Sequence, residues 1–246
     1  MKLKKVLLGA VAALSIVSLT ACGSKEKASS TSDSWDKMKS EKSVTIGFDN
    51  TFVPMGYKDK DGKNVGFDID LANAVFAEYG MKVKWQPINW DLKETELKNG
   101  KIDLIWNGYS ITSERKAKVQ FTDPYMKNEQ VLVTKKSSNI TSFADMKGKV
   151  LGAQSGSSGY DAFISKPEVL KDIVKDNDAS QYETFTQALI DLKNDRIDGL
   201  LHARAAFRAF VTDDYDVTGL HFVSQNPAHG AVLAFEDFGV AFEHVD

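Results

Sequence analysis

The sequence is poor in the residues that build metal and redox sites. Its single cysteine, Cys22, cannot form an internal disulfide, and no cysteine cluster is available for zinc or iron. The 4 histidines lie in the last 45 residues, without the spacing of a metal site. Phosphate-binding and dinucleotide-binding glycine motifs are missing, as is the Gly-x-Ser-x-Gly elbow of serine hydrolases. We therefore assign no catalytic residue, no metal ligand and no cofactor, and we expect a binding protein that is not an enzyme.

Neither sign of charge dominates the chain, because 31 basic residues stand against 34 acidic ones. Such a balance gives no electrostatic footprint for nucleic acid. The 5 prolines, 17 glycines and a hydrophobic fraction of 42% are ordinary for a globular protein, which excludes collagen, extended disorder and a multispan membrane protein. A length of 246 residues predicts one large domain or two small ones.

The amino-terminal segment has the pattern of a secretion signal. Lysines within the first five residues precede an apolar run over residues 6–19, which is too short for a comfortable membrane span. The sequence Leu19-Thr20-Ala21-Cys22 resembles a lipobox, so we expect a lipoprotein signal peptide over residues 1–21 and a lipidated, palmitate-bearing Cys22. An ordinary signal peptide with an incidental cysteine is the alternative. Residues 22–42 predict a flexible tether that holds the protein on the outer face of a bacterial membrane.

From residue 43 onward, strand patterns alternate with helical ones, as in an α/β protein. A helix is expected to begin at Asp68 as its cap and to end at Gly80, and a second helix is expected over about residues 91–99. The first helix should place Ile69, Ala72, Phe76 and Tyr79 on one buried face. Strand patterns cover residues 44–48, 81–85, 102–106 and 149–153.

An internal repeat suggests two related lobes. The segment Leu97-Lys98-Asn99-Gly100-Lys101-Ile102-Asp103-Leu104 recurs as Leu192-Lys193-Asn194-Asp195-Arg196-Ile197-Asp198-Gly199, and each copy is a helix end that runs into a strand. Chance similarity is the alternative. Because the order of strand, loop and helix also recurs, we expect two α/β lobes of about 90 residues with a ligand cleft between them.

Polar and aromatic residues follow the predicted strands. Asp49 can accept hydrogen bonds from an ammonium group and Phe52 can cover an apolar ligand surface, although an Asx turn with a core phenylalanine is the plainer interpretation. Arg115, close to Ser110, offers a planar fork for a carboxylate. The loop at 155–159 leads into a helix whose free N–H groups favour an anion. A surface arginine and a simple capping loop are the corresponding alternatives.

Five short motifs behind the lipobox carry a resemblance to a known family. They are Ile46-Gly47-Phe48-Asp49, Gly66-Phe67-Asp68-Ile69-Asp70-Leu71, Gly100-Lys101-Ile102-Asp103, Ser110-Ile111-Thr112-Ser113-Glu114-Arg115 and Phe121-Thr122-Asp123-Pro124-Tyr125. Residues 43 to about 201 thereby resemble the extracellular solute-binding proteins (family 3) of polar amino-acid ABC importers. The resemblance implies a two-lobe, periplasmic-binding-protein-like (type II) α/β fold, with lobe 1 at 43–132, lobe 2 at 133–205 and a crossover near 129–135.

The same resemblance implies a ligand site in the cleft. Arg115 would grip the ligand α-carboxylate with help from Ser110 and the loop at 157–158, while Phe52 and Trp90 would sandwich the ligand side chain. The carbonyl of Gly108 would face the α-amine, and Asp49 would contact a polar or charged side-chain end in some members. The expected ligand-binding set is Asp49, Phe52, Trp90, Asn107, Gly108, Ser110, Arg115, Ser157 and Ser158.

The carboxyl-terminal part departs from the family pattern. Ala203 stands where the resemblance predicts an acidic residue for the ligand α-ammonium. In residues 206–246 the expected return to lobe 1 is not recognisable, and the chain ends earlier than the resemblance predicts. One interpretation is a truncated or frame-shifted remnant with exposed apolar surface and poor stability. The other is a divergent tail that still crosses back through short strands; we prefer the first.

The predicted function is that of an extracytoplasmic receptor, lipid-anchored to the bacterial cell membrane. It would bind an amino acid, with a polar one favoured, and deliver it to the permease subunits of an ABC importer. We expect a monomer that contacts the membrane only through its lipid and binds no nucleic acid. Two rival functions remain: a dehydratase-type enzyme on the same scaffold, and a receptor that has lost its role in transport.

Overall fold

A computed structural model of the chain describes residues 34–203, 220–222 and 232–243. The predicted signal peptide, Cys22 and most of the tether lie outside the described residues, as does the tail at 204–219, 223–231 and 244–246. Within the described part of the chain, no helix combines the length and apolarity needed to cross a membrane.

One half of the main sheet is built from three parallel strands, with β1 between β5 and β6. Strand β1 is buried along almost its whole length, as expected for a parallel strand with neighbours on both sides. Helix α2 packs Ile69, Ala72 and Phe76 into the same core. The elements of this half are α1 (Ser34–Glu41), β1 (Ser43–Phe48), β2 (Thr51–Phe52), β3 (Gly56–Lys58), β4 (Asn64–Val65), α2 (Phe67–Glu78), β5 (Lys82–Pro87), η1 (Trp90–Leu92), α3 (Lys93–Lys98), β6 (Leu104–Ser110) and α4 (Ser113–Lys116).

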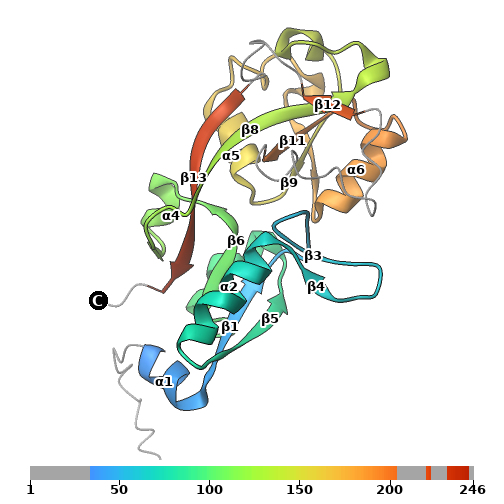
Figure 1. Cartoon of the computed structure of the whole chain (residues 1–246). Coiled ribbons are helices and arrows are strands. Elements are labelled where there is room, and N and C mark those ends of the chain that lie inside the picture. The colour runs from blue at the N-terminus through green and yellow to red at the C-terminus, as the bar shows by residue number, and fades with distance from the viewer. Residues whose placement is uncertain (1–33, 204–219, 223–231, 244–246) are drawn as a thin grey trace, which may run out of the picture. The chain divides into compact units, whose positions relative to one another are not determined.

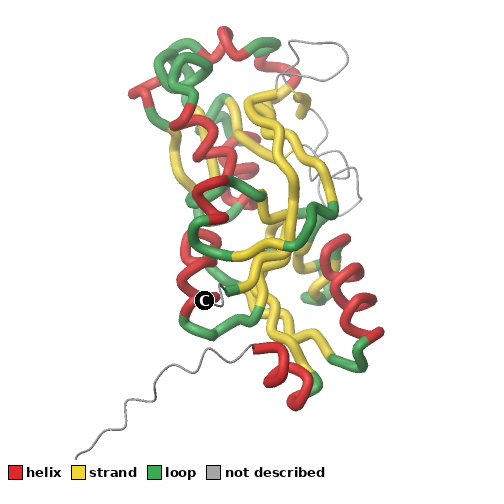
Figure 2. Tube along the Cα trace, turned by 90° about the vertical axis from the view of Figure 1, so that its left-hand side faces the viewer, coloured by secondary structure: helices red, strands yellow, loops and turns green. Residues whose placement is uncertain are grey.

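The other half repeats this arrangement, with β9 between β10 and β11 in a second parallel set. Helices flank the strands on both sides (Figure 2). The apolar core of this half includes Leu132, Met146, Leu151 and Phe163, all fully buried. Its elements are η2 (Lys136–Ser138), η3 (Phe143–Met146), β9 (Leu151–Gln154), α5 (Ser158–Ser165), η4 (Lys175–Asn177), β10 (Ala179–Tyr182), α6 (Phe185–Lys193) and β11 (Gly199–Ala203).

Two long strands join the halves. The order of the sheet is β10-β9-β11-β8-β13-β6-β1-β5, and both β8 and β13 pair in antiparallel fashion with their neighbours. Figure 1 shows β8 and β13 running side by side from one half to the other. The bounds of the joining strands are β7 (Gln120–Phe121), β8 (Met126–Lys135), β12 (Leu220–Phe222) and β13 (Val232–Phe242).

Strand β13 bears on the two interpretations of the tail. Its first part pairs with β8, from Val232 opposite Val131 to Phe238 opposite Met126, and its second part pairs with β6 and β7. Residues 232–242 therefore cross back toward the first half, which favours the divergent tail that crosses back. The boundaries of the two lobes stay a prediction.

The repeated sequence forms the same bonds in both halves. The Asp103 carboxylate accepts the Thr45 N–H at 2.7 Å, and the Asp198 carboxylate accepts the Val150 N–H at 2.8 Å. The two backbone N–H groups of these aspartates donate in return to the carbonyls of Thr45 and Val150, both at 2.8 Å. Each aspartate thus ties the start of its strand to the central strand of its own half. Chance similarity does not explain this equivalence.

Several details differ from the sequence-based expectations. Asp68 is not the cap of α2: the helix begins at Phe67, Gly66 is its N-cap, and the Asp68 side chain is fully buried. The carbonyls of Pro54 and Met55 satisfy the first two N–H groups, so no side-chain cap is needed. Tyr79 is not on the buried face, because it follows the end of α2 and is 62% exposed. The predicted strand at 102–106 begins later, as β6.

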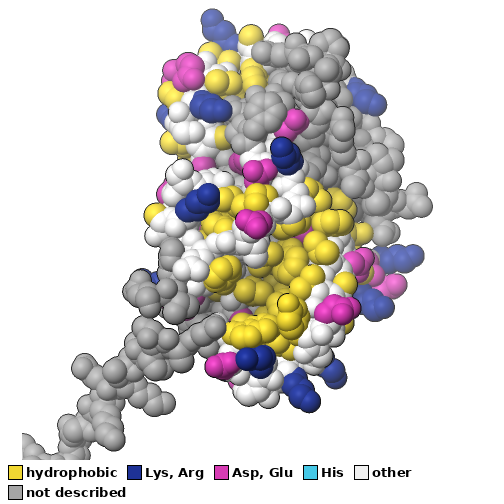
Figure 3. Space-filling view, turned by 60° about the vertical axis from the view of Figure 1, so that its left-hand side comes forward, with side chains coloured by type: hydrophobic (Ala, Val, Ile, Leu, Met, Phe, Trp, Pro, Cys, Tyr) yellow, Lys and Arg dark blue, Asp and Glu magenta, His cyan; other side chains and the backbone are white. Residues whose placement is uncertain are grey.

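Hydrophobic side chains also reach the surface. In the view of Figure 3 they gather in the lower part of the face shown. Among the described residues, Phe67, Tyr79, Leu92 and Ile190 are each at least 45% exposed. Scattered exposure of this kind is normal, and larger contiguous patches mark contact surfaces or a tendency to aggregate.

Removing either repeated carboxylate should destabilise the protein by a similar amount. Asp103→Ala and Asp198→Ala each leave a part-buried backbone N–H without its acceptor, which costs about 1–3 kcal/mol. Urea unfolding at pH 7 measures the loss. Asp172→Ala, at an exposed position, is the matched control. A large loss in only one of the two variants would contradict the equivalence of the repeats.

Candidate functional site

One pocket contains all nine residues that the sequence analysis expects to bind a ligand. The space inside it is about 360 Å³ with open solvent included, but only about 30 Å³ is left for the centres of water-sized molecules, so its own side chains largely fill it. Residues of both halves line it together with side chains from β8 and β13. The lining consists of Asp49, Phe52, Trp90, Asn107, Gly108, Ser110, Arg115, Gln130, Gln154, Ser157, Ser158, Phe185, Ala203 and Phe238.

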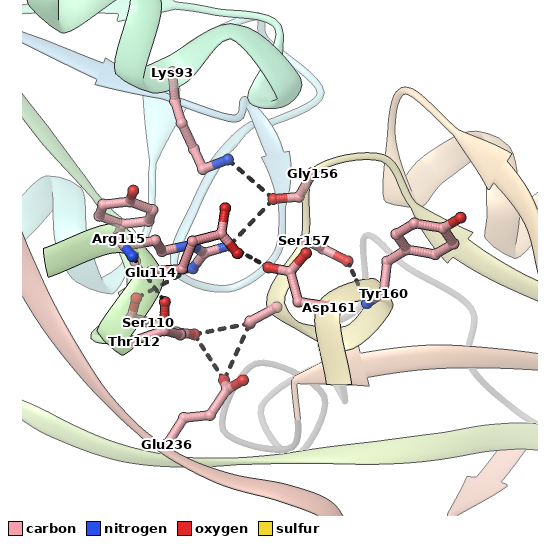
Figure 4. Close-up of polar contacts among 12 residues, drawn as sticks. Lys93, Ser110, Thr112, Glu114, Arg115, Gly156, Ser157, Tyr160, Asp161 and Glu236 are labelled. Atoms are coloured by element: carbon pink, nitrogen blue, oxygen red, sulfur yellow. Dashed lines mark hydrogen bonds and ion pairs between the residues drawn. The ribbon is translucent and has the colours of Figure 1, made fainter. Parts of the chain in front are cut away.

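Arg115 is a buried cation at one wall of this pocket. It lies on α4, a one-turn helix whose cap Thr112 accepts the Arg115 N–H, and its side chain is 5% exposed. Nη1 donates to the Ser110 carbonyl at 3.1 Å, and Nη2 donates to the Gly156 carbonyl at 3.1 Å (Figure 4). The Asp161 carboxylate lies 3.4 Å from Nη2, and burial raises the pKa of Asp161. The guanidinium thus meets mainly neutral carbonyls.

Lys93 is a second buried cation, which the sequence analysis missed. Its Nζ donates to the Gly156 carbonyl at 2.9 Å and lies 3.4 Å from the Glu94 carboxylate. Burial, followed by the nearby positive charge of Arg115, lowers the pKa of Lys93 to about 8. Lys93 follows Trp90 in a stretch rich in charged residues, so nothing in the sequence singles it out from the surface lysines around it.

Aromatic rings form another part of the pocket. Phe52 stacks on Phe185 with ring centroids 5.3 Å apart, and the His202 ring lies 4.2 Å from Phe185 and 5.8 Å from Phe52. Trp90 packs edge-on against Tyr109 at 5.8 Å. The structure therefore places both predicted rings, Phe52 and Trp90, in one pocket and adds Phe185, which the sequence analysis did not identify.

Asp49 contributes a carboxylate to the pocket lining. The residue is 5% exposed, and its carboxylate accepts hydrogen bonds from the N–H and hydroxyl of Thr51 and from Gln154 Nε2 at 2.6 Å. Burial raises the pKa of Asp49, although these hydrogen bonds oppose the change. The amide oxygen of Asn107 accepts the Asp49 N–H at 3.0 Å, which fixes the start of the loop. Gln154 belongs to the second half, so this bond crosses the pocket.

Gly108 is a position where a side chain would not fit. Its φ of 56° lies in the left-handed region, and an added Cβ would stand 2.7 Å from the Phe52 ring and 3.0 Å from the Phe238 ring. The absence of a side chain lets the rings approach the backbone of β6 at the pocket. The carbonyl role that the family resemblance implies for Gly108 stays a prediction.

Ser157 and Ser158 lie at the start of α5. Ser157 is the N-cap, and its hydroxyl accepts the Tyr160 N–H at 3.2 Å. The Ser158 hydroxyl lies 2.9 Å from the hydroxyl of Ser110, so two predicted residues from different halves meet directly. Backbone N–H groups at the helix start favour a negatively charged group here.

Glu236 is a site residue that the sequence analysis missed entirely. It lies on β13, and its Oε2 accepts hydrogen bonds from Ser110, Asn128, Gln130 and Ser158. Figure 4 shows the contact between Ser110 and Glu236. No sequence signal identified it, because the tail around it does not resemble the family. Ala203, by contrast, lies in the pocket as an uncharged, 4% exposed residue. Within the described ranges, no group of three or more His, Cys, Asp or Glu side chains could hold a metal ion.

Comparisons with known proteins identify the family and the fold that this chain resembles. The family model for bacterial extracellular solute-binding proteins, family 3, matches residues 44–202. The crystal structure of an ABC uptake transporter substrate binding protein from Streptococcus pneumoniae with bound histidine is 56% identical, covers 87% of this chain and 84% of that chain, and gives a TM-score of 0.81. This likeness confirms the predicted two-lobe α/β fold.

Two proteins of Bacillus subtilis (strain 168) are also similar. The arginine-binding extracellular protein ArtP is 37% identical over 155 residues, which are 63% of this chain and 57% of that protein. The probable amino-acid-binding protein YxeM is 33% identical over 210 residues, which are 85% of this chain and 74% of that protein. The match to ArtP thus spans less than two thirds of its length.

A buried carboxyl group stands behind the pocket wall. Asp68 is fully buried, and burial raises its pKa to about 7, while Tyr125, Gly108 and Trp106 lower it in part. The Tyr125 hydroxyl also accepts the Gly108 N–H at 3.1 Å. The charge of Asp68 therefore acts on groups that hold the backbone of the pocket.

Asp68 should make the protein less stable as the pH rises from about 4 to about 7. Its folded-state pKa lies above the unfolded value, so the folded state holds this proton more tightly, and the advantage is lost as the unfolded chain deprotonates. We expect Asp68→Asn to gain stability relative to the native protein between pH 5 and pH 8, by up to about 2–3 kcal/mol. Urea unfolding at pH 5 and at pH 8 measures this gain, and Asp61→Asn, at an exposed position, is the control. A stability difference between Asp68→Asn and the native protein that does not change with pH would contradict the raised pKa of Asp68.

Proposed function

Because the chain belongs to the bacterial extracellular solute-binding proteins of family 3, we propose that it binds an amino acid in this pocket and delivers it to an ABC importer. The observation that carries the proposal is that all nine residues of the predicted binding set line one pocket. Proteins of this family are solute-binding receptors, which supports a receptor over an enzyme. No comparison favours the dehydratase alternative.

The charges in the pocket suit the two ends of an amino acid. Arg115 is a buried planar fork beside the N-terminus of α5, and its present partners are largely carbonyls that a ligand carboxylate can replace. Phe52, Trp90 and Phe185 can cover the apolar part of a side chain. Asp49 gives the pocket a carboxylate that favours a cationic or hydrogen-bonding side-chain end.

The named ligands of related proteins point to nitrogen-rich side chains. The S. pneumoniae protein is described with bound histidine, and ArtP is named as arginine-binding. We therefore propose histidine, arginine or another polar amino acid as the ligand. The stacked rings and the buried Asp49 carboxylate accept an imidazole or a guanidinium equally well by their chemistry.

Binding is proposed to proceed by closure of one half on the other. Bonds already cross the pocket from Lys93 and Arg115 to Gly156 and from Gln154 to Asp49. These contacts bury charged groups, and a buried charge needs hydrogen-bond partners to offset its lost hydration. A ligand that binds the closed arrangement of the two halves more tightly than an open one would stabilise the closed arrangement.

We also propose that Cys22 is lipidated and that the protein acts as a monomer on the outer face of the membrane. The lipobox-like sequence before Cys22 and the polar segment after it support this proposal. A two-chain lipid anchor would keep the receptor near the permease subunits while the tether leaves it free to move.

A selective ligand should raise the melting temperature of the mature protein. We propose thermal melts of residues 23–246 with each of the twenty amino acids and with cystine. Ligand at a hundred times its dissociation constant adds about 2.7 kcal/mol to the free energy of unfolding, enough to move the midpoint by several degrees. Arg115→Ala should weaken that ligand by roughly a hundredfold, and Arg115→Lys should weaken it less. Arg196→Ala, which removes the exposed partner of the ion pair with Asp191, is the control.

Several results would contradict this proposal. A cooperative melt that no amino acid shifts would show that the pocket does not bind this class of ligand. Unchanged affinity in Arg115→Ala would remove Arg115 from the carboxylate site. The absence of any cooperative melt would support the alternative of a receptor that has lost its function.

Replacing Cys22 should release the protein from the membrane. In a bacterium that processes lipoproteins, the native chain is expected to incorporate labelled palmitate and to sediment with membranes, because the acyl chains anchor it. Cys22→Ala should lose the label and leave an unprocessed or soluble form. Ser24→Ala, two residues further on, is the matched control. Label retained in Cys22→Ala would contradict lipidation at this cysteine.

A further inference from the structure

Glu236 is a charged group at the pocket for which the proposed function has no role. It is half-buried on β13, opposite Asn128 of β8, and its Oε2 alone accepts four hydrogen bonds. Within residues 34–203, 220–222 and 232–243, no lysine or arginine forms an ion pair with it. The donors are Ser110 Oγ at 2.7 Å, Gln130 Nε2 at 2.9 Å, Asn128 Nδ2 at 3.1 Å and Ser158 Oγ at 3.1 Å.

The hydroxyl protons of Ser110 and Ser158 are already used. Each hydroxyl has one proton, and the two oxygens lie 2.9 Å apart and within hydrogen-bond distance of Glu236 Oε2. Because the carboxylate only accepts, the short contact with Glu236 uses the Ser110 proton, and the Ser158 proton has Glu236 Oε2 and Ser110 Oγ as its acceptors. Toward the pocket, which both serines line, the hydroxyls present lone pairs and act as acceptors.

An acceptor wall backed by a negative charge favours a cation. A buried ammonium needs hydrogen-bond acceptors and a nearby anion, because desolvation otherwise makes its burial costly. Ala203, in the same pocket, supplies neither. Asp49 is a carboxylate of the lining, but among the described residues its side chain bonds to Thr51 and Gln154 and not to these two serines. The charge at this wall therefore comes from Glu236.

We propose that Glu236, acting through Ser110 and Ser158, makes this wall of the pocket the subsite for the α-ammonium group of the ligand. The assignment rests on the proposed function, in which the ligand is an amino acid. It leaves the α-carboxylate to Arg115 and to backbone N–H groups near the start of α5. Glu236 is a positioning residue: it fixes the direction of two hydroxyl protons and supplies the opposite charge.

A second interpretation of the same contacts predicts the opposite effect of Glu236 on ligand binding. Four donors around one carboxylate oxygen could instead form a carboxylate site, which Glu236 fills in competition with the ligand. In that case, removing the charge of Glu236 would strengthen ligand binding. Under our proposal it weakens binding, and only for ligands that carry an α-ammonium. Whether loss of the Glu236 charge weakens or strengthens ligand binding therefore distinguishes the two interpretations.

The experiment compares L-amino acids with analogues that lack the α-amino group. The probes are L-histidine, L-arginine and L-glutamine, and their counterparts 3-(imidazol-4-yl)propanoate, 5-guanidinopentanoate and glutaramate. Calorimetric titration gives the affinities of the native protein and of Glu236→Gln, which keeps the shape of the side chain. We expect Glu236→Gln to weaken the bound L-amino acid by about 10- to 100-fold and to change the affinity of its analogue less than about threefold.

Control variants and melts keep the outcomes distinct. Asp237→Asn removes the neighbouring carboxylate of β13 and should leave both affinities unchanged; thermal melts establish that each variant is folded. Tighter binding of the L-amino acid, equal weakening of both ligands, or no change in Glu236→Gln would each overturn the inference. A native protein that binds none of the three L-amino acids would overturn the proposed function for these ligands and this inference with it. If Glu236→Gln does not fold, Glu236→Asp, which withdraws the charge by one methylene, must show the same selective loss.

Discussion

The antiparallel pairing of β8 with β13 is the constraint on which the site depends. Without β13, strands β6 and β8 would each have an unpaired edge, and nothing in the sheet would link the first half to the second. The pairing register also places Glu236 opposite Asn128 and Phe238 opposite Met126. Because Glu236 contacts Ser110 of one half and Ser158 of the other, the same strand that closes the sheet also brings the two polar walls of the pocket together.

Charge is separated within the pocket. Lys93 and Arg115 both donate to the single carbonyl of Gly156, and each also has a carboxylate at 3.4 Å, that of Glu94 for Lys93 and that of Asp161 for Arg115. At another wall the Glu236 carboxylate meets only neutral donors among the described residues. Burying charges is costly unless their partners offset the lost hydration. Under the proposed function, the negative end of a zwitterion would face Arg115, and its positive end would face the wall backed by Glu236.

The sequence analysis succeeded where local patterns determine the structure. The repeat around Asp103 and Asp198 predicted equivalent lobes because the same carboxylate-to-backbone bond recurs in each. The family resemblance supplied the nine predicted binding residues, and the structure places all of them at one pocket. Asp68 was misjudged as a cap, since Gly66 and the carbonyls of a distant loop already satisfy the helix start. Lys93 and Glu236 could not be found in this way, because their burial results from contacts between the halves.

The tail therefore matters more for recognition than its sequence suggests. The family model ends at residue 202, yet Glu236 and Phe238 both lie beyond it, one bonded to the pocket serines and the other lining the cavity. A strand pairs through its backbone, so a half-buried position such as Glu236 can vary with less effect on packing than the buried Phe238. Variation in such a strand can change which charge faces the ligand while the repeated scaffold stays the same. In this chain Ala203, the last residue of β11, packs with Phe52, Phe185 and Phe238, so under our proposal the carboxylate that favours the α-ammonium group comes from β13.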